Sequence, residues 1–129
     1  CFVLPKDLFH YKPCERWGES YHQLAEMQVL YDYSNYLQRP DLAALADRML
    51  LAIEDTWPQW IKPDGDLHYC YYGEGVYGRT DYPYLTYNDL FAMQKTLLAR
   101  NGAENTALRA LMESKLRWMT QQGITGYFK

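Results

Sequence analysis

Hydrophobic residues recur at the three- and four-residue spacing of α-helices in four stretches of this chain, separated by turn-forming residues. The spacing predicts helices at about residues 21–37, 40–56, 87–100 and 104–122. In the first and third helices the apolar residues occupy more than one face, which predicts that both are largely enclosed. The second and fourth helices are more amphipathic and are therefore expected on the outside.

Residues at the predicted helix ends support these boundaries. Ser20 stands three residues before Gln23, and Thr86 stands three residues before Asp89, which is the spacing of a capping box at a helix start. Gly102 and Gly123 follow the third and fourth apolar stretches, where glycine commonly ends a helix.

A nine-residue phrase occurs twice, as 20–28 (SYHQLAEMQ) and 86–94 (TYNDLFAMQ). The offset, 87 minus 21, is 66 residues, and the alignment continues without a gap into the second and fourth helices. The repeat predicts an all-α fold of two consecutive αα-hairpins, each with an inner and an outer helix. We expect one domain over 1–129, with repeat one at about 16–60, a connection at about 61–85 and repeat two at about 86–123.

Composition excludes several classes of protein. A chain of 129 residues that is 48% hydrophobic can build one globular core. A net charge of -3, with both signs mixed along the sequence, argues against nucleic acid as a partner. No apolar stretch is long enough for a membrane span. Three cysteines without paired spacing indicate no compartment.

Tyrosines gather in the connection between the repeats. Of the 13 tyrosines, seven lie between positions 68 and 87. Pro63-Asp64-Gly65 predicts a turn, 66–72 predicts a short strand, and Gly73-Glu74-Gly75 could turn a β-hairpin, so the connection is either a long loop or a short hairpin. The rings either pack the connection onto the helices or contact a ligand, because tyrosine offers both a flat apolar face and a hydroxyl.

Hairpin geometry is expected to bring the candidate proton-transferring residues to one end of the molecule. Long connections and inner-helix N-termini should lie together, which predicts that 16–22 and 69–89 share an end. Tyr21, His22, Tyr87 and Asn88 would then form a polar cluster able to exchange protons near neutral pH. The alternative is that His22 caps or packs locally.

Metal ligands are sparse in the sequence. Asp64-Gly65-Asp66, with Glu74 and Asp81, could bind calcium, but the run lacks the spacing of a calcium loop and turn formation explains it. His68 and Cys70 are scattered single ligands rather than a zinc motif. We therefore predict no metal and no cofactor.

The two hairpins resemble the α/α toroids, rings of helical hairpins found in glycoside hydrolases, polysaccharide lyases and glucuronyl epimerases. Arg16-Trp17 through His22, then Gln28-Val29-Leu30, is similar to a run in the C-terminal helical domain of glucuronyl epimerases. The resemblance implies a saccharide ligand, which could contain uronate, and maps proton-handling roles onto Tyr21, His22 and Tyr87. The candidate saccharide contacts are Trp17, Tyr69, Tyr71, Tyr72, Tyr77, Arg79 and Asn88.

Two functions lead at this stage, and an isoprenoid- or peptide-modifying enzyme on the same toroidal scaffold is a third, because a fold does not fix a function. One is a carbohydrate-active or carbohydrate-binding segment, which as an enzyme would be a glycoside hydrolase, polysaccharide lyase or sugar epimerase. The other is a non-catalytic helical-repeat module that associates with itself or with another chain. Two hairpins are fewer than a complete ring, so the chain belongs to a larger toroid, closes a four-helix arrangement alone, or assembles with copies of itself.

Overall fold

The computed structural model describes residues 18–68, 70–73, 76–77 and 85–125, with side chains at 23–68 and 86–125. It confirms an all-α fold of four helices that pack as two hairpins. The helices are α1 (Ser20–Leu37), α2 (Pro40–Thr56), α3 (Leu85–Asn101) and α4 (Thr106–Gln121). The first residues of α2 and α4 are separated by 106 minus 40, or 66 residues, which is the offset of the repeat.

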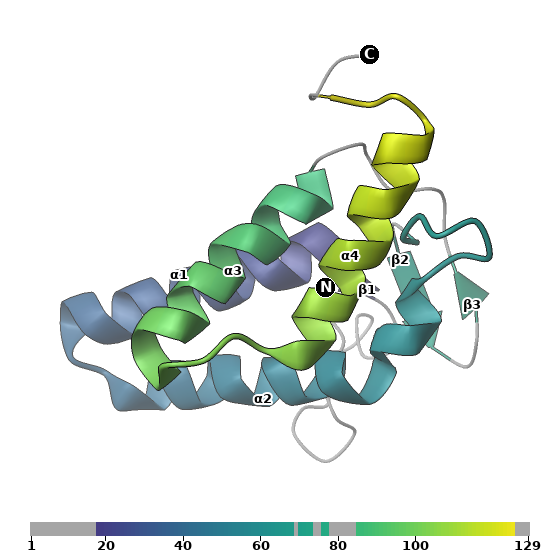
Figure 1. Ribbon diagram of the computed structural model, residues 1–129. Helices are drawn as coiled ribbons and strands as arrows, with labels where there is room; N and C mark the ends of the chain where they lie inside the picture. The colour runs from purple at the N-terminus through teal and green to yellow at the C-terminus, as the bar shows by residue number, and fades with distance from the viewer. Residues whose placement is uncertain (1–17, 69, 74–75, 78–84, 126–129) are drawn as a thin grey trace.

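The four helices surround a common interior (Figure 1). The inner helix α1 packs against both α2 and α3, α3 packs against α4, and α4 also contacts α2. In the first hairpin α2 runs alongside α1, whereas α4 rises steeply from the level of α2. The described helices therefore close around one core.

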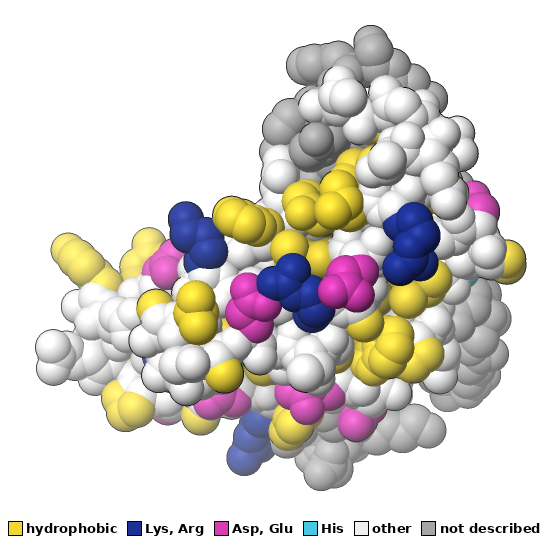
Figure 2. Space-filling model, viewed as in Figure 1, with side chains coloured by type: hydrophobic (Ala, Val, Ile, Leu, Met, Phe, Trp, Pro, Cys, Tyr) yellow, Lys and Arg dark blue, Asp and Glu magenta, His cyan; other side chains and the backbone are white. Residues whose placement is uncertain are grey.

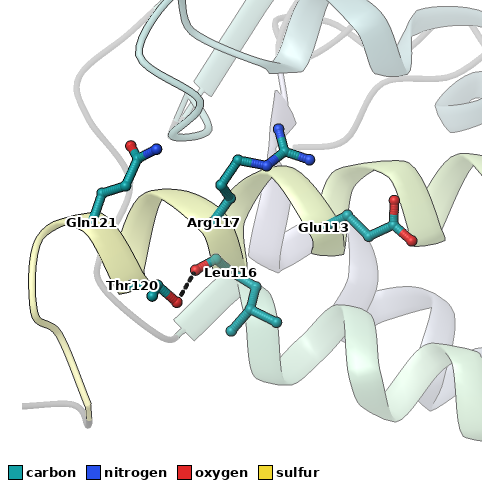
Figure 3. A pocket seen from close by; sticks show the side chains of 5 residues that line it. All are labelled: Glu113, Leu116, Arg117, Thr120 and Gln121. Carbon is teal, nitrogen blue, oxygen red and sulfur yellow. Dashed lines mark hydrogen bonds between the residues drawn. The ribbon is translucent and has the colours of Figure 1, made fainter.

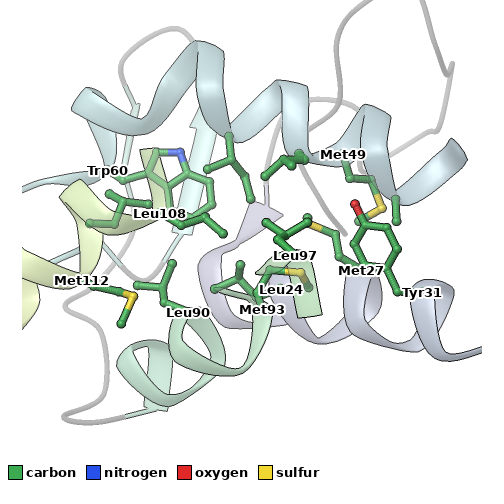
Figure 4. Packing of buried hydrophobic residues seen from close by; sticks show 14 of the residues in the cluster. Leu24, Met27, Tyr31, Met49, Trp60, Leu90, Met93, Leu97, Leu108 and Met112 are labelled. Carbon is green, nitrogen blue, oxygen red and sulfur yellow. The ribbon is translucent and has the colours of Figure 1, made fainter. Parts of the chain in front are cut away.

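The repeated phrase supplies the centre of this core (Figure 4). Leu24 and Met27 of α1, together with their repeat equivalents Leu90 and Met93 of α3, are all at most 1% exposed. The cluster also takes buried residues from the outer helices, from the short 3-10 helix η2 (Trp57–Trp60) and from the connection: Ala43, Ala46, Met49, Leu50, Ile53, Trp60, Leu67, Leu108, Leu111 and Met112. Burying each large aliphatic side chain contributes about 1.5–3 kcal/mol, so this shared interior joins the hairpins.

The prediction that the inner helices are enclosed is wrong. Tyr36 of α1 is 82% exposed, and Val29 and Tyr33 on the same helix are each about half exposed. Phe91 and Leu98 of α3 are also about half exposed. Each inner helix has two neighbours among the described helices, which cover one side and leave the opposite apolar side without a described helix packed on it.

The helix ends differ in detail from the capping predictions. Helix α3 begins at Leu85, so Thr86 lies inside its first turn, where it is fully buried. Helix α4 begins at Thr106, and Asn105 is its N-cap, with a side chain that accepts a hydrogen bond from the Leu108 N–H at 3.1 Å. The predicted stops are confirmed, because Gly102 and Gly123 both adopt positive φ angles that favour glycine.

A small antiparallel sheet stands beside the helices. Its order is β1 (Gly18–Glu19), β2 (Cys70–Gly73) and β3 (Val76–Tyr77). Strand β2 begins later than the predicted strand, because Leu67 instead forms an isolated antiparallel bridge with Ile61. The other parts of the tyrosine-rich connection lie outside the described residues.

Candidate functional site

The sheet brings two distant parts of the chain together at the N-terminal end of α1. Gly18 of β1 pairs with Tyr71 of β2, and Tyr71 also pairs with Tyr77 of β3. Because β1 leads directly into α1, the backbone that carries Tyr21 lies next to this sheet. The ladder therefore provides the backbone scaffold of the candidate site.

The structure places the backbone of most of the predicted site residues, but only some of their side chains. Tyr21 and His22 lie in the first turn of α1. Tyr71 and Tyr72 lie in β2, and Tyr77 lies in β3. The side chains of these residues, and the whole of Trp17, Tyr69 and Arg79, lie outside the described residues. Convergence of these side chains on one cleft stays a prediction.

Tyr87 and Asn88 occupy the first turn of α3 and are both half-buried. Tyr87 packs against the hydrophobic core. Its ring therefore contributes to packing, which is one of the two roles considered for the tyrosines, while its partial exposure leaves a surface for contact.

Before it reaches β2, the chain leaves the first hairpin through a tight turn. The Gly65 N–H donates to the Lys62 carbonyl at 2.9 Å, and the Lys62 N–H donates to the Asp66 carbonyl at 2.8 Å. The Asp64 carboxylate accepts from the Asp66 N–H at 3.0 Å. Gly65 has a φ of +96°, which a residue with a side chain rarely adopts. Turn formation therefore accounts for this aspartate-glycine run.

At the end of this turn lies a buried ion pair. Lys115 Nζ of α4 is 2.6 Å from Asp66 Oδ1, and both side chains are fully buried. The Leu67 N–H donates to the same oxygen at 2.8 Å. Within the described part of the chain, Asp66 Oδ2 has no hydrogen-bond partner. A buried carboxylate needs such compensation because losing its hydration is costly.

The role of Lys115 was missed from the sequence, although a signal was present. Lys115 follows Leu111 by four residues and Met112 by three, so it falls on the apolar face of α4. Its repeat equivalent in α2 is Met49, at 115 minus 66, which is fully buried. A lysine at a core position indicates a buried partner, but the sequence does not identify which of its acidic residues that partner is.

Among the titratable residues whose side chains are described, His68 is the nearest to the sheet along the chain. Its backbone N–H donates to the Trp60 carbonyl at 2.8 Å. Partial burial lowers the pKa of His68 below its usual value, and the charge of Lys62 lowers it further, while Asp66 and Asp64 oppose this effect. The imidazole is therefore mainly neutral near neutral pH.

No group of three or more histidine, cysteine or acidic residues suited to holding a metal occurs in the described ranges. Asp66, the most buried acidic residue there, is paired with a lysine cation. The described helices also lack the length and apolar character that crossing a membrane requires.

An open hollow of about 430 Å³ lies along the outward face of α4 (Figure 3). Its described lining consists of Glu113, Leu116, Arg117, Thr120 and Gln121. The Thr120 hydroxyl donates to the Leu116 carbonyl at 2.8 Å, so it already has an acceptor within the helix. On the face shown in Figure 2, charged side chains of both signs lie among apolar ones. The hollow therefore has no described polar groups that converge from different elements, as a catalytic site would require.

Comparisons with protein-family models, with curated proteins and with solved structures find no match for this chain. Its function must therefore be inferred from its own residues and their geometry.

Proposed function

We propose that the chain is a carbohydrate-binding or carbohydrate-active segment of α/α-toroid type, and that its sheet-bearing end contacts a poly- or oligosaccharide. The observation that carries this proposal is the strand ladder, in which Tyr71 pairs with both Gly18 and Tyr77. It concentrates tyrosine-bearing backbone at the start of α1. Tyrosine rings can stack on sugar rings while their hydroxyls form hydrogen bonds.

The toroid assignment is supported by the contact between the two inner helices. Gln28 of α1 and Thr96 of α3 exchange hydrogen bonds of 2.7 and 3.0 Å. In a ring of hairpins each inner helix packs on the next inner helix in this way. The steep rise of α4 departs from such a ring, in which the outer helices run alongside each other (Figure 1).

If the segment is catalytic, Tyr21, His22 and Tyr87 are the residues that we propose handle protons. Histidine and tyrosine transfer protons efficiently when their pKa values are shifted toward the working pH. A uronate substrate would suit this end, because the first N–H groups of a helix attract a carboxylate. The enzyme class would be glycoside hydrolase, polysaccharide lyase or sugar epimerase.

Calorimetry with neutral and uronate-containing oligosaccharides tests the binding proposal. We expect saturable binding, which Tyr71→Ala should weaken by about threefold to tenfold, as the loss of one aromatic contact would. Tyr36→Ala is the matched control, since Tyr36 is a highly exposed tyrosine in the last turns of α1. If no oligosaccharide in the panel binds, or both variants bind as the wild type does, the proposal fails.

Measuring turnover distinguishes an enzyme from a segment that only binds saccharide. Products from uronate oligosaccharides are measured for the wild type and for His22→Gln. Loss of product formation with unchanged affinity would assign a catalytic role to His22. Saturable binding without any product would make this segment a binding module.

A second candidate function rests on the exposed apolar face of α1. Val29, Tyr33, Tyr36 and Leu37 are all at least half exposed and recur at helical spacing. This stripe favours a helical-repeat module that associates with itself or with another chain. Light scattering over a dilution series should then show a specific oligomer that Tyr33→Glu dissociates. Arg48→Glu, on the exposed side of α2, is the control, and a clean monomer with no captured partner counts against this function.

A further inference from the structure

We propose that the buried Asp66–Lys115 pair positions β2 on the helices and so determines where the tyrosine-bearing strands lie. Asp66 precedes Cys70, the first residue of β2, by only four residues. Strand β2 is the central strand of the sheet and pairs with both β1 and β3. A displacement of Asp66 along α4 would therefore move the whole ladder.

The chain between Asp66 and β2 is too short for β2 to move independently of Asp66. Leu67 is fully buried and bridges to Ile61, and the His68 N–H donates to the Trp60 carbonyl at 2.8 Å. Leu67 and His68, which are the described residues within this path, are thus tied to the end of the first hairpin. The ion pair ties the same path to α4, which belongs to the second hairpin.

The opposite charges of Asp66 and Lys115 specify one register in which the turn docks on α4. A methionine fills the equivalent place in the first hairpin, so an apolar side chain would be enough for packing. Apolar replacements of buried ion pairs are often equally stable, and in some proteins a buried polar pair is what specifies a single register. Lys115 therefore allows the turn to dock only where Asp66 Oδ1 can reach its ammonium group.

A second directional contact lies beside the first. The Ser114 hydroxyl donates to the Gly65 carbonyl at 2.6 Å, one residue before Asp66 in the turn and one residue before Lys115 in the helix. The Lys115 ammonium also lies 4.9 Å from the centre of the Trp118 ring, within the range of a cation–π contact. Two adjacent residues of α4 thus hold two adjacent residues of the turn.

Because Asp66 Oδ2 has no described hydrogen-bond partner, removing Lys115 should greatly lower the free energy of unfolding. In the described structure the carboxylate charge is compensated only at Oδ1, by Lys115 and the Leu67 N–H. Lys115→Met alone would leave a buried, uncompensated charge and could unfold the protein. Asp66→Asn/Lys115→Met removes both charges and keeps an oxygen that can accept the Leu67 N–H.

Native-state hydrogen exchange of this double variant, together with chemical unfolding, tests positioning against simple stabilisation. We expect an unfolding constant within about tenfold of the wild type, because neither charge is left buried alone. The amides of Leu67, His68 and β2 should exchange at least about tenfold faster relative to those of α2. Arg109→Met, on the same helix as Lys115, removes the exposed ion pair with Glu104, which precedes α4, and should change neither quantity.

Wild-type protection at Leu67, His68 and β2 in the double variant would overturn the inference. Proportional loss of protection throughout α2 and β2 would overturn it as well, because the pair would then supply only global stability. Oligosaccharide affinity is the one readout that rests on the proposed function, and we expect it to fall in the double variant. If the wild type binds no saccharide, the proposed function fails while hydrogen exchange still decides the positioning role.

Discussion

The phenol of Tyr31 in α1 donates a 2.7 Å hydrogen bond to the carboxylate of Asp47 in α2. The guanidinium of Arg100, from α3, lies 4.7 Å from the centre of the same ring. Burial, and then the hydrogen bond to Asp47, raise the pKa of Tyr31 above its usual value. One fully buried side chain therefore connects three of the four helices.

Replacing Tyr31 with Phe should lower the free energy of unfolding by about 0.5–1.5 kcal/mol. The ring keeps its packing, and the exposed Asp47 can hydrogen-bond to water, so only the phenol hydrogen bond is lost. Urea denaturation measures the change. Tyr36→Phe, at a highly exposed position of the same helix, should leave the midpoint unchanged, and equal midpoints for both variants would contradict this assignment.

Asn105→Ala should destabilise the protein by about 1 kcal/mol through loss of the α4 N-cap. Gln94 holds the backbone of Asn105 with bonds of 2.7 and 2.8 Å, so the turn should keep its path. Thermal unfolding measures the loss. Asn105→Ser, like the alanine variant, loses the 3.2 Å bond from the Asn105 amide to Glu54, but it retains an acceptor for the Leu108 N–H and should preserve most of the stability. A loss as large as that of the alanine variant would argue against capping.

Gln38→Gly should stabilise the protein by about 0.5–1 kcal/mol. Gln38 is exposed and has a φ of 56°, a conformation that costs a residue with a side chain more than it costs glycine. The adjoining bond from the Arg39 N–H to the Ser34 carbonyl, 3.0 Å long, does not involve the replaced side chain. Chemical denaturation should show no such gain for Gln38→Ala, and a gain in both variants would rule out relief of backbone strain.

Stability should fall as the pH is lowered from about 7 to 5, in part through His68. The folded state lowers the pKa of His68, so the unfolded chain binds this proton more readily, and the contribution is complete above the unfolded pKa. Unfolding free energies measured across this window should fall less steeply in His68→Gln. Lys62, Asp64 and Asp66 remain in the variant, so an unchanged slope would remove His68 as a cause.

The helices could be predicted because their signals are local. Leu24, Met27, Leu90 and Met93 recur at spacings that place them on one helical face, and each is buried as that spacing predicts. The exposure of Tyr36 and Phe91 could not be predicted in this way. An apolar residue on a second face is buried only if another element packs there, and that depends on which helices the whole chain supplies.

For the candidate site, the sequence allowed us to predict only which backbone segments lie together. Hairpin geometry placed the start of α1 and the tyrosine-rich connection at one end, and the pairing of Gly18 with Tyr71 agrees with this. The pairing of Asp66 with Lys115, 49 residues apart, has no local signature. Which acid meets a core lysine is determined by the docking of the turn on α4.

By itself, the sequence determined four helices, their repeat offset of 66 residues and the residues at the centre of the core, because each follows from periodicity within a few turns. Only the tertiary structure decided that the four helices close around one interior, that α4 rises steeply from α2, and that Lys115 meets Asp66. These features depend on contacts between distant residues, whose free energies are gained only when the whole chain has packed.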